Sequence, residues 1–155
     1  MLRPGDTGGE RDLEAFWRGV GERRGGEVTF TTFATYLGRA GERPLVLPGL
    51  LYRVGDRFWF EDVPRDSWLL RIVPPRRPFA KTEIAFERSG VAFRNVVSRN
   101  TAYRCMAGRV APGAAATLGR IERLYAVPVV QVGLADGGAL FFEAMREREL
   151  VAELG

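Results

Sequence analysis

The chain has 155 residues, of which 46% are hydrophobic and 27% are charged, and its formal net charge is +4. This length and composition are typical of one globular domain and exclude a largely disordered protein. The chain has no histidine and only one cysteine, Cys105, which excludes a Ser-His or Cys-His catalytic pair, a thiolate zinc site and an internal disulfide.

Residues 1–24 are predicted to form a flexible N-terminal segment that contains a short helix over 11–20. Leu13, Phe16, Trp17 and Val20 are spaced i, i+3, i+4 and i+7, which places them on one helical face. Glycines interrupt this pattern, so we expect the main domain to begin near Gly25 and to cover residues 25–155.

The main domain is predicted to be built from short antiparallel strands, because runs of β-branched and aromatic residues alternate with turn residues. Hairpin turns are expected at Gly55-Asp56, at 88–90 and at 135–138. The segment 112–124 is compatible with either a helical turn or a loop. The expected strands are 28–36, 50–54, 57–61, 68–73, 82–87, 91–97, 101–107, 127–134 and 139–143.

The last segment, 144–154, is predicted to be an amphipathic helix, with Met145, Leu150, Val151 and Leu154 on its apolar side. Consecutive strands with tight turns imply an antiparallel sheet that forms a small barrel or two packed sheets. We therefore predict a mainly β fold, with a short N-terminal helix and a C-terminal helix that caps the barrel.

Two basic features are candidate contacts for a partner. Arg76, Arg77 and Lys81 follow a pair of prolines, which would hold the guanidinium groups on a stiff, exposed segment. This segment is either an anion-binding or acidic-partner site or a solvated loop. Arg99 is a further candidate for the same anionic ligand. Trp59 lies between two phenylalanines and is either part of a second apolar layer or an exposed anchor for a partner.

Residues 120–154, with their strand, tight turn, aromatic strand and final helix, resemble the end of a pleckstrin-homology-like (PH or GRAM-type) domain. The hairpin LLYRVGDRFWFE (50–61) looks like the opening hairpin of that family. The resemblance implies a β-barrel scaffold that binds peptides, proteins or lipid headgroups, with Arg53 and Arg57 near the basic positions of lipid-binding members.

A second resemblance is to PilZ-type β-barrels, which bind cyclic dinucleotides. It is based on PRRPFAK (75–81) and ERSGVAF (87–93), which are similar to the arginine-rich loop and the strand motif of that family. It implies an anionic nucleotide as ligand and remains the alternative to a PH-like domain.

The sequence therefore predicts a non-catalytic binding or adaptor domain without a cofactor or metal, whose partner is another protein or an anionic molecule. The net charge of +4 is small for a dedicated nucleic-acid binder, so a weak nucleic-acid contact is the third hypothesis. No apolar run reaches the roughly 20 residues that span a bilayer, and the N-terminus lacks a hydrophobic signal segment. We expect a cytoplasmic protein.

Overall fold

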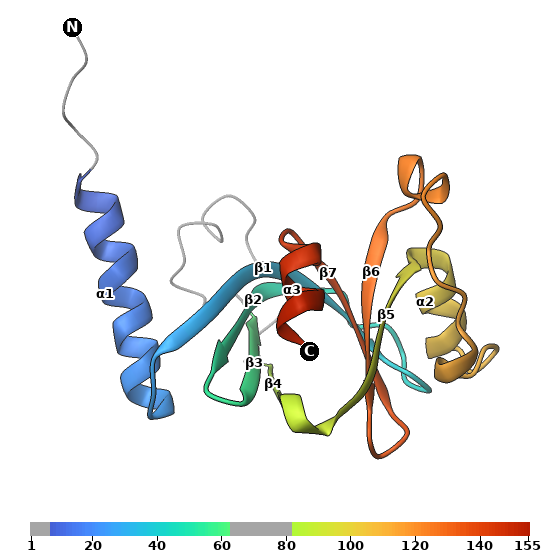
Figure 1. Cartoon of the computed structure of the whole chain (residues 1–155), viewed down its shortest axis with the longest axis horizontal. Helices are drawn as coiled ribbons and strands as arrows, with labels where there is room; N and C mark the ends of the chain where they lie inside the picture. Colours follow the sequence, from blue (N-terminus) through green and yellow to red (C-terminus); the bar gives the residue numbers. More distant parts are fainter. Residues whose placement is uncertain (1–6, 63–81) are drawn as a thin grey trace, which may run out of the picture.

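The structure, a computed structural model, describes residues 7–62 and 82–155, with side chains from residue 11 onward. Within these ranges the chain forms one seven-stranded sheet with three α-helices (Figure 1). The strands are β1 Val28–Arg39, β2 Leu47–Val54, β3 Arg57–Asp62, β4 Glu83–Glu87, β5 Val91–Ser98, β6 Pro128–Leu134 and β7 Ala139–Ala144. The helices are α1 Thr7–Arg24, α2 Arg99–Met106 and α3 Glu147–Glu153, with 3-10 turns η2 Arg88–Gly90, η3 Pro112–Ala114 and η4 Glu122–Leu124.

The strand order is β4-β3-β2-β1-β7-β6-β5, and every neighbouring pair is antiparallel. The first strand therefore pairs with the last, and the two edge strands, β4 and β5, are consecutive in the chain. Figure 1 shows the sheet curled around α3. The prediction of a β-rich, antiparallel, barrel-like fold with an N-terminal and a C-terminal helix is confirmed.

The inner face of the curled sheet holds the main core. Phe58, Phe60 and Phe142 are fully buried there and contact one another or Phe86 through their rings. Leu150 of α3 is also fully buried in this cluster. The C-terminal helix thus fills the interior of the sheet, because a small barrel of aromatic and branched residues leaves apolar surface that needs a cover.

The outer face carries two smaller clusters, each under one helix. Val20 of α1 packs with Tyr52 of β2. On the other part of the face, α2 packs over Val97, Val129 and Phe141. Figure 1 shows α1 and α2 at opposite ends of the sheet.

The expected strand over 101–107 is wrong, because these residues belong to α2. The side chain of Ser98 accepts a hydrogen bond from the Thr101 amide and so caps the helix. Ala102, Cys105 and Met106 are the buried residues of this helix, and their spacing of three and four matches a helical period.

The expected hairpin at 88–90 is also wrong. Residues Arg88–Gly90 form a 3-10 turn, and the strands on either side lie at opposite edges of the sheet. The Arg88 amide donates to the Asp56 carbonyl and the Ala135 amide donates to the Gly90 carbonyl. The link is therefore tied to the β2–β3 turn at one end and to the β6–β7 turn at the other, so it crosses the opening of the sheet.

Both terminal helices differ in length from the prediction. The first continues through Gly19 and Gly21 to Arg24, and then ends where Gly25 has a φ of +78°. The last begins at Glu147, because residue 145 still bonds to β1. Segment 112–124 contains only the turns η3 and η4. The expected strand 68–73 lies outside the described residues.

The close approach of β2 to β3 can be tested by a substitution at Gly49. A Cβ added to Gly49 would lie 2.2 Å from the Glu61 carbonyl oxygen, which is backbone and cannot rotate away. We expect Gly49→Ala to lower the free energy of unfolding by roughly 1–3 kcal/mol, measured by urea denaturation. Gly19→Ala is the control, because nothing lies within 4 Å of its added Cβ in the middle of α1. An equal stability of the two variants would contradict this packing.

Candidate functional site

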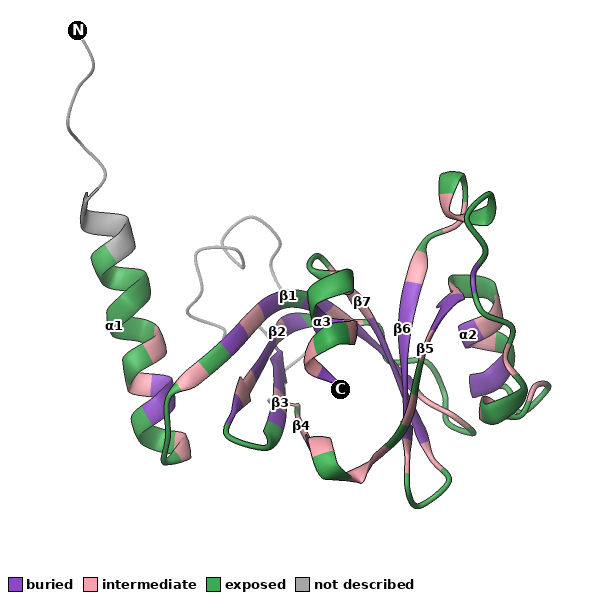
Figure 2. Ribbon diagram, in the orientation of Figure 1, coloured by how far each residue is buried: buried purple, intermediate pink, exposed green. Residues whose placement is uncertain are grey.

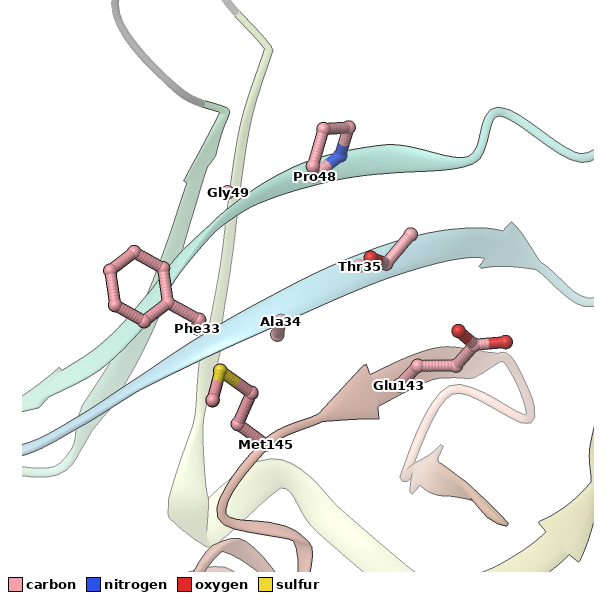
Figure 3. Close-up of a pocket in the computed structure, with 7 residues that line it drawn as sticks. All are labelled: Phe33, Ala34, Thr35, Pro48, Gly49, Glu143 and Met145. Atoms are coloured by element: carbon pink, nitrogen blue, oxygen red, sulfur yellow. The ribbon is translucent and has the colours of Figure 1, made fainter. Parts of the chain in front are cut away.

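The outer face between α1 and α2 carries an apolar groove. It has a volume of about 240 Å³ and is lined by residues of β1, β2 and the end of β7 (Figure 3). We call this the outer groove. Its lining residues are Phe33, Ala34, Thr35, Pro48, Gly49, Glu143 and Met145. Figure 3 shows Phe33 and Met145 beside each other at one end and the Glu143 carboxylate at the other.

The groove is part of a longer apolar row that crosses four strands. Phe33 pairs with Leu50 of β2, and the Met145 amide donates to the Phe33 carbonyl. The β6–β7 pairs end at Val130 and Phe142, and Val127 and Met145 each lie three residues beyond this last pair, at the same end of the two strands. The exposed fractions are 52% for Phe33, 80% for Met145 and 41% for Val127. The described part of the chain therefore leaves several large apolar side chains exposed at this end of the outer face.

The strand period explains why Phe33 is exposed. Phe30 and Tyr36 are buried on the inner face, and Phe33 lies at an odd number of residues from both. Side chains alternate between faces along a strand, so one of the three aromatics must point outward. Thr31 and Thr35 share the outer side with Phe33, and neither is fully buried.

The row continues into residues 120–127, which we call the tip. Ile121, Leu124 and Tyr125 have exposed fractions of 76%, 84% and 77%. Figure 1 shows the tip as a loop that projects beyond the first residues of β6, and Figure 2 shows it as mostly exposed. Arg123 holds the tip to α3, because its guanidinium donates to both oxygens of Glu147 at 3.0 and 3.2 Å.

A second ion pair borders the groove. Arg99, at the start of α2, donates to both carboxylate oxygens of Glu143. These hydrogen bonds to Glu143 raise the pKa of Arg99. The Arg99 amide also donates to the Val127 carbonyl at 3.2 Å. This pair fixes the end of β7 against α2 and gives one end of the groove a polar margin.

Elsewhere on the outer face, the half-buried Arg24 attaches α1 to the sheet. The Arg24 guanidinium contacts Glu61, Glu83 and the Tyr52 hydroxyl, and it lies 3.7 Å from the centroid of the Trp59 ring. The Arg24 side chain is only 16% exposed and that of Glu61 only 8%. The hydrogen bond with Glu83 is the largest of the contacts that raise the pKa of Arg24.

The predicted contact residues on the β2–β3 hairpin lie on opposite faces of the sheet. Arg53 points to the inner side, where it pairs with Glu153 of α3 at 2.8 Å. Arg57 lies on the outer side with its guanidinium 4.7 Å from the centroid of the Trp59 ring. Trp59 is half-buried in the cluster under α1. The interpretation of Trp59 as part of a second apolar layer therefore agrees with its position.

The remaining predicted contact residues do not form a common site with Arg53, Arg57 and Trp59. Arg99 lies next to β5, at the opposite edge of the strand order from the β2–β3 hairpin. Arg76, Arg77 and Lys81 lie outside the described residues. Among the described predicted residues, only Arg57 and Trp59 contact each other.

The exposed apolar residues were missed by the sequence analysis. Met145 was assigned to the apolar side of the last helix, and Leu124 to an ambiguous segment. The spacing of Ile121, Leu124 and Tyr125 is i, i+3 and i+4, which would place all three on one side of a helix. The chain forms only the short turn η4 there, and all three side chains are exposed. No local signal in the sequence therefore distinguishes them from buried residues.

Within residues 7–62 and 82–155, no three or more His, Cys, Asp or Glu side chains are grouped so that they could hold a metal ion. None of the described helices combines the length and the hydropathy that crossing a bilayer requires. Comparison of the chain with family models, with curated proteins and with solved structures found no significant match.

The attachment of α1 can be tested at Arg24. We expect Arg24→Met to lower the free energy of unfolding by roughly 2–3 kcal/mol, because it leaves the buried Glu61 carboxylate without this cation. Hydrogen exchange of the α1 amides should accelerate. Arg39→Met is the matched control: it breaks an ion pair with Asp136 whose side chains are 37% and 61% exposed, so its effect should stay below about 1 kcal/mol. Similar losses in both variants would show that Arg24 does not anchor the helix.

Proposed function

We propose that this protein is a non-catalytic binding module that engages a partner protein through the outer groove and the apolar row. The observation that supports this most directly is the line of exposed side chains formed by Phe33, Met145 and Val127. Soluble proteins seldom leave a large contiguous apolar surface in water, and such surfaces mark sites of contact.

The residue types in the groove suit recognition of a protein. Phe33 offers a rigid aromatic surface, and the unbranched side chain of Met145 adapts its shape to what it contacts. Burying one side chain of this size contributes about 1.5–3 kcal/mol, and a few such residues dominate most interfaces. The Arg99–Glu143 pair supplies a polar margin that orients the partner without itself being buried.

The curled sheet with an inserted C-terminal helix is compatible with the proposed PH-like scaffold. The contacts of Arg53, Arg57 and Arg99, the described arginines among the predicted contacts, favour a protein partner over an anionic nucleotide. Arg53 and Arg99 each pair with a glutamate, and Arg57 lies on the ring of Trp59. We also propose a cytoplasmic location, which agrees with the burial of the single cysteine, Cys105, as an unpaired thiol.

Photo-crosslinking tests the proposed site. A photoreactive phenylalanine analogue is placed at position 145, in the groove, or at position 29, which is exposed on β1 outside it. We expect irradiation to give a discrete protein adduct from position 145 and none from position 29. Introducing Phe33→Asp into the position-145 protein should reduce the adduct at least tenfold, because a carboxylate must be desolvated against apolar atoms. Equal yields from positions 145 and 29 would contradict the proposal.

A further inference from the structure

The exposed apolar residues of the groove, the row and the tip form one patch. Phe33 and Met145 are joined by a backbone hydrogen bond, and the other four members are close together in the chain; the six are Phe33, Met145, Val127, Tyr125, Leu124 and Ile121. With side chains of this size, their exposed parts amount to roughly 700 Å², near the ~800 Å² that each partner of a standard interface buries. A patch of this size requires a cover.

The patch is hollow at one end and projecting at the other. The groove is concave and holds Phe33 and Met145, whereas the tip projects beyond the first residues of β6 and carries Leu124 and Tyr125 (Figures 1 and 3). Val127 stands between them. A two-fold axis near Val127 would bring the tip of each molecule onto the groove of the other, so that both ends are buried at once.

The charges next to the patch argue against a lipid surface or an acidic protein as the cover. An anionic partner needs unpaired cations beside the apolar contact. Two of the bases that border the patch, Arg99 and Arg123, each pair through two hydrogen bonds with Glu143 and Glu147 respectively. Their charge is therefore largely neutralised within the molecule.

The other charges around the patch are of mixed sign. Arg120 and Glu122 are exposed on the tip, and Arg148 and Glu149 are exposed on α3. In an arrangement with two-fold symmetry, a base of one molecule meets an acid of the other, and the reciprocal pair forms at the same time. A surface with both signs around an apolar centre is thus complementary to itself.

We propose that the patch is the contact between two copies of this chain, arranged as a symmetric dimer with tip on groove. This inference rests on the proposed function and names the partner protein of the same site.

Sedimentation velocity of the purified full chain tests it. The wild type should sediment as a dimer. Leu124→Asp should give a monomer with an unchanged circular dichroism spectrum, because residue 124 is 84% exposed and its substitution leaves the core intact. Leu45→Asp is the matched control: Leu45 is 52% exposed, and its amide bonds to Leu37, near the other end of β7. This variant should remain dimeric.

Val127→Cys tests the symmetry. A residue near the two-fold axis faces its own copy, so oxidation should join two chains through position 127. The wild type should stay unjoined, because its Cys105 is 1% exposed. A disulfide-linked pair that forms equally in the Leu124→Asp background would overturn the proposal, since it would reflect random collision.

If something other than a second copy of the chain binds to the patch, the sedimentation and crosslinking experiments give different results. A wild type that sediments as a monomer at every soluble concentration overturns the dimer. If position 145 then still crosslinks to a different protein, the proposed binding function stands and only this inference fails. Flotation of a monomer with anionic vesicles, lost in Leu124→Asp, would identify a lipid surface instead. An adduct from position 145 to residues 63–81 of the same chain would show that the patch is covered internally.

Discussion

The sheet carries apolar side chains on both of its faces, and the arrangement of the three helices follows from the need to cover them. Curling brings the inner aromatics such as Phe60 and Phe142 together, and α3 fills the remaining space with Leu150. Among the described residues, the outer face is covered where α1 lies on Tyr52 and where α2 and the segment after it lie on Phe141 and its neighbours. Two separate helices leave the strip between them at the surface, and the outer groove lies in this strip.

Arginines determine where the covering elements attach. Arg24 joins α1 to β3 and β4, Arg53 joins the β2–β3 hairpin to α3, and Arg123 joins the tip to the same helix. A guanidinium group is suited to this work, because its planar fork can donate to two acceptors while its stem packs on apolar surface. The abundance of arginine in this sequence is therefore explained at these positions by internal contacts, which a count of charges alone does not distinguish from a binding surface.

Local patterns predicted the β2–β3 and β6–β7 hairpins, because each turn and the apolar runs beside it are adjacent in the chain. Predictions failed where the structure of a segment depends on contacts with residues that are far away in the chain. The residues of α2 have strand-like composition, and only the cap at Ser98 and the helical spacing of the buried residues distinguish them. Phe33 and Met145 meet only because β1 pairs with β7, and no local pattern specifies that register. The apolar row, and with it the candidate site, depends on the closure of the sheet.

The position of the tip and groove decides what kind of assembly they can form. If a projecting surface and a concave surface lie on opposite sides of a molecule, each added copy leaves one of them free, and an open chain of copies forms. If both lie on the same side, two copies can bury both surfaces at once, and the assembly is a closed dimer. The two edge strands of the sheet are less suited to association between copies. Exposed Glu83 and Glu87 stand at the ends of β4, and β5 already accepts a hydrogen bond from Leu118 at Val96. The proposed dimer therefore uses the apolar patch and not a sheet edge, and a two-fold axis near Val127 would limit the association to a pair.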